Sequence, residues 1–154
     1  MRDNIESNHL IFISSDGKRE GYEIFKERIN NNSWPIYNKT PQSINIQEGK
    51  KVLFYIAGTN NCSQNFIASA SISNIINQKT TTVDPNQEFK QVLFSVQFKD
   101  INYFEKPLNI KEHINNLSFI EPDKRKIYGL YFQGGICKIN KQSYDYIINN
   151  TSKN

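Results

Sequence analysis

The sequence predicts a mixed α/β (α+β) fold, and three observations lead to that prediction. Residues 91–98 alternate apolar and polar side chains, which is the period of a strand with one buried face. Residues 22–29 and 144–148 instead repeat their apolar side chains at helical spacing. The chain has 154 residues, with 37% hydrophobic and 12% aromatic residues, which is enough for one core in a single domain over residues 1–154.

The N-terminal part predicts a strand followed by a helix. Residues 9–14 (HLIFIS) form a short apolar run rich in Ile and Phe, which is typical of a central strand. The helical pattern begins at Gly21 and ends in three asparagines at 30–32, which favour turns and helix caps.

The next stretch, residues 33–41 (SWPIYNKTP), predicts a stiff loop. Pro35 and Pro41 fix φ and disfavour helix for the residue before each of them. We therefore expect Trp34 and Tyr37 to lie outside the hydrogen-bonded elements, with Lys39 nearby. An indole, a phenol and a cation held in one stiff loop suit a flat, electron-rich ligand.

Two more strands follow in the middle of the chain. Residues 51–57 are apolar on both faces, as in a strand that is covered on two sides or closed in a barrel. Residues 65–73 alternate in the manner of a strand, with small side chains that indicate a closely packed neighbour. Residues 58–64 and 78–88 are polar and predict loops.

The C-terminal third predicts two helices around a closing strand. Pro107 breaks the strand pattern, and Asn109 resembles the N-cap of a short helix to Leu117. Residues 121–126 predict a charged loop, and residues 127–139 predict a strand with a bend at its two glycines. Asn140 caps a last helix, and the polar tail from about residue 149 is expected to fray.

Composition excludes several classes of protein. The two cysteines lie far apart, without a CxxC motif or a histidine at ligand spacing, so we expect no zinc site and no other metal or cofactor. The sequence shows no signal peptide and no apolar run near the roughly 20 residues of a membrane helix. We therefore expect a soluble, cytoplasmic protein that contacts no membrane, and a net charge of +4 permits a polyanionic partner.

No catalytic pattern stands out. The chain has two histidines, His9 and His113, and neither lies in a pattern that pairs a nucleophile with a base. Cys137 lies in an apolar segment and is interpreted as core filler. The residues therefore indicate a binding protein rather than an enzyme.

A family resemblance is carried by two stretches of the chain. The segment W-P-I-Y-x-K-T-P, followed by E-G-K-K-V-x-F-Y-I-A-G, resembles the EVE domain family, and residues 124–139 (KRKIYGLYFQGGICKI) resemble its closing part. The EVE domain is PUA-like and is related to YTH and ASCH domains. The resemblance implies a strongly bent sheet or small barrel with flanking helices. It also implies binding of nucleic acid, DNA or RNA, with a modified base held in an aromatic pocket.

The resemblance suggests where such a pocket lies. We expect Trp34 to form one wall, with Tyr37, Tyr55 or Tyr128 nearby, because a base stacks on an aromatic face. Polar groups at the pocket edge give selectivity, and the candidates are Ser14, Ser15 and Gln133. Phosphates would meet a basic rim formed by Lys39, Lys50, Lys51, Lys124, Arg125 and Lys126.

Two other functions stay open on the sequence. One is a hydrolase of the ASCH type that acts on a modified nucleoside, with Lys39 or Lys51 and the acid Glu48 as its first candidates. The other is a protein-interaction module that binds no nucleic acid. The resemblance also implies that a nuclease or NTPase partner chain supplies any enzymatic activity.

Overall fold

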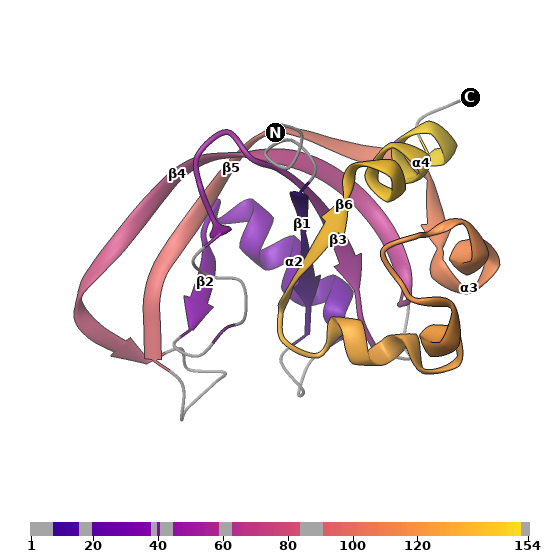
Figure 1. The fold of residues 1–154 in the computed structure, drawn as a ribbon. Helices are drawn as coiled ribbons and strands as arrows, with labels where there is room; N and C mark the ends of the chain where they lie inside the picture. Colours follow the sequence, from indigo (N-terminus) through magenta and orange to yellow (C-terminus); the bar gives the residue numbers. More distant parts are fainter. Residues whose placement is uncertain are drawn as a thin grey trace, which may run out of the picture.

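The computed structural model describes residues 8–15, 20–37, 40, 45–58, 63–83 and 91–151, and gives only the backbone of residues 8, 78–83 and 91. Within these residues, six strands form one sheet in the order β2-β5-β4-β3-β1-β6. The long strands β4 and β5 arch over the molecule, so the sheet curls into a half-barrel that is open below (Figure 1). The predicted α+β class and the strongly bent sheet are confirmed.

The first half of the chain builds the centre of the sheet. Strand β1 (Asn8–Ser14) runs parallel to β3 (Lys51–Ile56), with Phe12 opposite Phe54. Helix α2 (Gly21–Asn30) follows β1 in the chain and buries Ile24 and Phe25. All three elements agree with the helical and strand patterns of the sequence.

The stiff loop predicted around Trp34 is wrong, because these residues form strand β2 (Trp34–Tyr37). This strand pairs antiparallel with β5 at one edge of the sheet, where Pro35 lies opposite Ser95. An edge strand tolerates a proline because one of its two sides makes no ladder hydrogen bonds. Lys39 and Pro41 lie outside the described residues.

Strands β4 (Asn65–Val83) and β5 (Gln91–Asn109) are each much longer than predicted. Residues 78–83 continue β4 where a loop over 78–88 was expected, while residues 84–88 of that loop lie outside the described residues. Pro107 does not end β5. Phe66 pairs with Leu108 but Ala68 pairs with Tyr103, so the extra residues of β5, Pro107 among them, form a bulge that needs no ladder hydrogen bond from proline.

Short helices follow β5, namely α3 (Ile110–His113) and the 3-10 helices η2 (Ile114–Asn116) and η3 (Pro122–Phe132). The predicted cap is present, since the Asn109 side chain accepts a hydrogen bond from the Lys111 amide. Two other predictions are wrong here. Residues 122–126 of the predicted charged loop belong to η3, and the closing strand β6 covers only Ile136–Asn140.

The chain ends in helix α4 (Lys141–Thr151). The Asn140 side-chain Oδ1 accepts from the Ser143 backbone amide at 3.0 Å, as expected of an N-cap. The tail predicted from residue 149 is corrected, because the helix continues to Thr151, whose side chain is buried. No helix among the described residues is long and apolar enough to cross a membrane.

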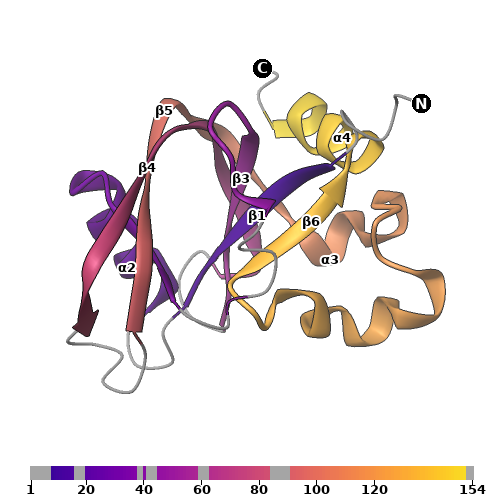
Figure 2. The same ribbon diagram turned by 60° about the vertical axis from the view of Figure 1, so that its left-hand side comes forward.

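The sheet separates two apolar cores. The concave face, under the arch, packs Phe12, Trp34, Phe54 and Phe98 against α2. The other face packs Tyr55, Phe66 and Phe132 beneath α3, η3 and α4. Figure 2 shows α2 on one side of the sheet, with α3, η3 and α4 on the other. Consecutive residues of β1 and β3 alternate between these cores, which explains why both strands are apolar on both faces.

Candidate functional site

The carboxyl ends of β1 and β3 lie together at one edge of the sheet. Because these strands are parallel, both end there, and their antiparallel neighbours β6 and β4 begin there. The Ala57 amide donates to the Ser14 carbonyl oxygen at 3.3 Å, and the Ile13 amide donates to the Gly135 carbonyl oxygen at 2.8 Å. We call this group the carboxyl edge, and define it as Ser14, Ser15, Ala57, Gly58, Gln64 and Gly135.

The backbone of the carboxyl edge borders open space. Gly58 and Gly135 have φ values of +103° and +91°, which favour glycine over any residue with a side chain. A Cβ atom built on either glycine meets no atom within 4 Å. Ser15, between them, is exposed. Another molecule can therefore approach the main chain closely on this side.

Ser14 plays a structural part in this edge. Its hydroxyl is fully buried and donates to the Gly21 carbonyl oxygen at 2.5 Å. This bond ties the end of β1 to the start of α2. The hydroxyl of Ser14 is thus committed to the fold, whereas Ser15 and Gln133, the other two candidates for selectivity, are exposed.

Gln64 links the edge to η3, and sequence reasoning missed it. The Tyr128 hydroxyl donates to Gln64 Oε1 at 2.5 Å, and Gln64 Nε2 donates to the Gly58 carbonyl oxygen at 3.2 Å. Gln64 has a positive φ of 63°, and its carbonyl oxygen accepts from the Ile110 amide at 3.0 Å. In the sequence it is one more polar residue of a polar loop, so no local signal distinguishes it.

Tyr55 and Tyr128 come together here as neutral phenols. The Tyr55 ring is buried and stacks on Phe132 at a centroid distance of 4.2 Å. Burial raises the pKa of Tyr55, and the nearby Tyr128 raises it further. Burial also raises the pKa of Tyr128. Both hydroxyls therefore keep their protons at neutral pH and can act as hydrogen-bond donors.

Trp34 lies on the opposite face of the sheet from these tyrosines. Its side chain is 2% exposed, and its ring centroid lies 5.3 Å from that of Phe54. The Arg28 guanidinium covers the indole at 5.0 Å. The arrangement expected from the sequence, with Tyr55 or Tyr128 beside Trp34, is therefore corrected: the sheet separates them. Tyr37 is half-buried at the end of β2, on the open side of the arch where β1 also ends (Figure 1).

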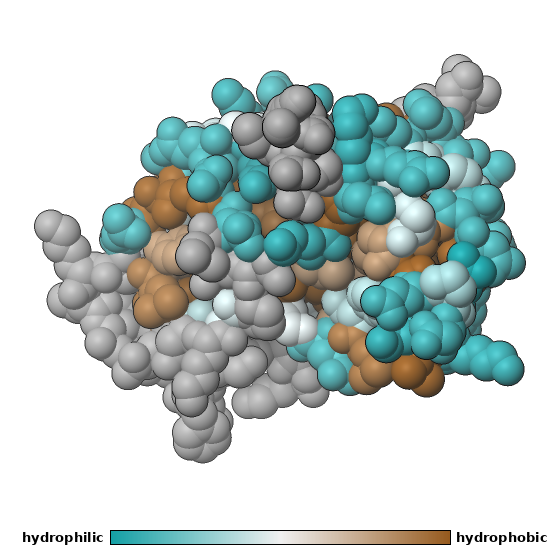
Figure 3. Space-filling model, in the orientation of Figure 1, coloured by the Kyte–Doolittle hydropathy of each residue, from teal (hydrophilic) through white to brown (hydrophobic). Residues whose placement is uncertain are grey.

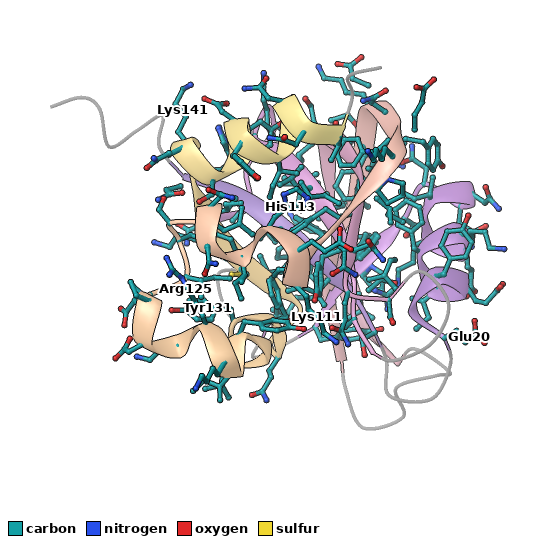
Figure 4. The ribbon with its side chains drawn as sticks, turned by 90° about the vertical axis from the view of Figure 1, so that its right-hand side faces the viewer. Glu20, Lys111, His113, Arg125, Tyr131 and Lys141 are labelled. Carbon is teal, nitrogen blue, oxygen red and sulfur yellow. The ribbon has the colours of Figure 1, made fainter. Side chains whose placement is uncertain are left out.

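The basic residues divide into two groups rather than one rim. Lys124, Arg125 and Lys126 lie on η3, which leads through Gln133 into the carboxyl edge. Lys51 begins β3 and Lys50 precedes it. Burial lowers the pKa of His9, and the charges of Lys51, Lys141 and Lys50 lower it further. Figure 4 shows Arg125 and Tyr131 together on η3, well away from Lys141 at the start of α4.

The three cations of η3 differ in their partners. Lys124 forms an ion pair with Glu121 at 3.2 Å. Arg125 Nη2 donates to the Asn115 carbonyl oxygen at 3.5 Å, and its buried Nε has no hydrogen-bond partner among the described residues. Lys126 is exposed. Arg125 and Lys126 are the η3 cations best placed to meet an external anion.

The residues suggested for a hydrolase do not meet at the carboxyl edge. Lys51 begins β3 and Glu48 precedes it, so both lie at the other end of that strand. Lys39 lies outside the described residues. Within the described part of the chain, no three His, Cys, Asp or Glu side chains gather as a metal site would require.

Comparison with known proteins identifies the class of fold first. The crystal structure of Atu2648 from Agrobacterium tumefaciens has a TM-score of 0.57 and 13% identity, and the match covers 96% of both chains. Rpa0253 from Rhodopseudomonas palustris has a TM-score of 0.55 and 9% identity, over 92% of this chain and 90% of the other. Human THYN1, solved with DNA that contains 5-methylcytosine, has a TM-score of 0.55 and 15% identity, over 96% and 99%. The curled sheet with flanking helices is thus the PUA-like fold.

The family follows from the sequence itself. The family model of the EVE domain matches residues 14–150, which is nearly the whole chain. The chain therefore belongs to the EVE domain family, as the resemblance of its two motif stretches implied. No curated protein sequence matches it.

Proposed function

We propose that this protein is a noncatalytic nucleic-acid-binding module that holds a modified base at the carboxyl edge. The observation that carries the proposal is the open main chain at Gly58 and Gly135, with the exposed Ser15 between them and the exposed Gln133 close by in the chain. Membership of the EVE family supports it, and so does the fold shared with human THYN1, which was solved with DNA containing 5-methylcytosine.

The groups at this edge match the needs of base recognition. A base presents donors and acceptors on its edges and a flat face for stacking. Ser15 and the Gln133 amide supply side-chain donors and acceptors, and the glycines expose main-chain ones. The half-buried rings of Tyr37 and Tyr128 remain as candidates for stacking, while Trp34 supports the fold from the other face.

Positive charge supplies the part of the binding that does not depend on the nucleotide sequence. The net charge is +4, and Arg125 and Lys126 lie on the helix that leads into the carboxyl edge. We assign these two side chains to phosphates, because phosphate contacts position a nucleic acid while contacts to the base specify it. In this proposal the protein works in the cytoplasm, and a nuclease or NTPase partner chain performs any reaction.

A direct test compares oligonucleotides that differ only in one modified base. Oligonucleotides with 5-methylcytosine or unmodified cytosine, as DNA and as RNA, are titrated against the wild type and against a Ser15→Ala/Gln133→Ala variant. We expect the wild type to prefer the modified base by about tenfold or more, equivalent to roughly 1.4 kcal/mol. The double variant should lose most of this preference and keep weak, salt-sensitive binding.

The matched control is Gln47→Ala, which removes an exposed glutamine near the start of β3. It should leave both affinity and preference unchanged. If the wild type binds none of the oligonucleotides, the proposed function is wrong. If the double variant keeps the preference for the modified base, that base binds somewhere other than the carboxyl edge.

A further inference from the structure

Helix η3 presents two large apolar side chains to solvent. Ile127 is 52% exposed and Leu130 is 54% exposed. Figure 3 shows an apolar area over η3 with hydrophilic residues beside it. Single exposed apolar residues are common on proteins, but two of them on one short helix next to a candidate site call for a partner.

The backbone of η3 explains why these two side chains point outward. Ile127 has φ −120° and ψ 36°, which interrupts the helix. The residues around it are held inward: Tyr128 donates to Gln64, and the Tyr131 hydroxyl accepts from the Glu121 amide at 3.0 Å. Phe132 is buried in the core against Tyr55. Ile127 and Leu130 are thus displayed on a fixed support, and little entropy is lost when they meet a partner.

Charge indicates what kind of partner fits this surface. Arg125 and Lys126 come directly before Ile127, while Lys124 is already paired with Glu121. An apolar pair flanked by cations is complementary to a polymer that has phosphates outside and stacked bases inside. A duplex has that arrangement.

We propose that η3 is a wedge that enters the base stack of duplex DNA, with Ile127 or Leu130 filling the space that an extruded base leaves. This inference rests on the proposed function. Extruding a base costs free energy in lost stacking and pairing, and an inserted apolar side chain offsets part of that cost. A base in a single strand is already free of a partner, so the wedge contributes only to duplex binding.

The test compares duplex and single-stranded DNA of the same sequence with one central 5-methylcytosine. The variant Ile127→Ser/Leu130→Ser should bind the duplex at least about tenfold more weakly than the wild type, and the single strand within about twofold. A 2-aminopurine next to the modified cytosine should brighten when the wild type binds the duplex, and much less with the variant, because fewer bases are unstacked.

Two controls separate a wedge from a general contact. Ile76→Ser/Leu93→Ser changes two apolar side chains of similar exposure, 42% and 43%, on β4 and β5, and should affect neither form of DNA. Lys126→Ala should weaken binding to duplex and single strand alike. Both serine variants change exposed positions, and circular dichroism verifies that they remain folded.

The outcomes distinguish the two proposals. The wedge would be overturned if the Ile127→Ser/Leu130→Ser variant lost affinity equally for duplex and single strand, or if its affinity for the duplex were unchanged. Neither result would contradict the proposed recognition of a modified base. A wild type that binds neither form of modified DNA would overturn the proposed function and the wedge with it.

Discussion

The indole of Trp34 is part of a cluster of aromatic rings under the arch of the sheet. Its ring centroid lies 5.6 Å from Phe12 and 6.4 Å from Phe25, both in edge-to-face geometry. With 2% of its surface exposed, it offers no face to a base in this structure. Its contribution at the scale of a single residue is therefore to stability.

We expect Trp34→Ala to lower the free energy of unfolding by about 3–5 kcal/mol, the usual cost of truncating a large buried aromatic side chain. Urea denaturation followed by circular dichroism measures it. Tyr103→Ala is the matched control, because that ring is 58% exposed, and its change should stay within about 0.5 kcal/mol. A Trp34→Ala protein as stable as the Tyr103→Ala protein would show that the indole does not hold the core.

Helix α2 and the two central strands meet at a point with no room for a side chain. A Cβ atom built on Gly21 would lie 2.7 Å from the Ser14 carbonyl oxygen and 2.9 Å from Ile56 Cγ2. The close approach is what allows the Ser14 hydroxyl to reach the Gly21 carbonyl oxygen. At the scale of elements, this glycine sets the position of α2 against the carboxyl edge.

Gly21→Ala should therefore destabilise the protein by about 1–3 kcal/mol, because the strand ends or the helix must move apart. Gly129→Ala on η3 is the control, since a Cβ there meets nothing within 4 Å, and it should be neutral or slightly stabilising. Thermal unfolding of both variants decides the point. Equal melting temperatures would mean that α2 can shift without cost.

At the scale of the whole molecule, one sheet holds a core on each face, and several acidic groups are buried in the core beneath α3, η3 and α4. Burial raises the pKa of the Cys137 thiol from 9.0 to about 12 and raises the pKa values of Tyr55 and Tyr144 above 10.0. Above pH 9 the unfolded chain releases protons that the folded chain retains. Fewer protons are then bound in the unfolded state, so stability falls as the pH rises.

The stability of the wild type should be steady below about pH 9 and should decline from there toward pH 12, as the thiol and then the phenols titrate in the unfolded chain. Urea denaturation at half-unit steps of pH gives the curve. Cys137→Ser removes the thiol, so its decline between pH 9 and 10 should be shallower than that of the wild type. Parallel curves over that interval would exclude the buried thiol as a cause.

Several local features could be predicted from the sequence because their signals are local. The alternation at 91–98, the helical stripe of α2 and the caps Asn109 and Asn140 each depend on residues a few positions apart. The two motif stretches likewise indicate the EVE family without any information on tertiary contacts. In these cases the side-chain pattern and the backbone hydrogen bonds agree.

Tertiary structure alone decided which of these residues meet. Trp34 and Tyr55 are both aromatic and both near a strand, yet the alternation of side chains places them on opposite faces of the sheet. Pro35 and Pro107 predict breaks in the sequence pattern, because a proline has the same local signature in a loop, at a sheet edge or in a bulge. The link between Gln64 and η3 depends on a hydrogen bond between two residues that lie 64 positions apart in the chain, Gln64 and Tyr128. By itself, the sequence determined the family, the fold class and most of the strands and helices. Pairings between distant residues, which no local pattern encodes, decide which side chains share a face of the sheet, which residues form the carboxyl edge and which side of η3 is exposed.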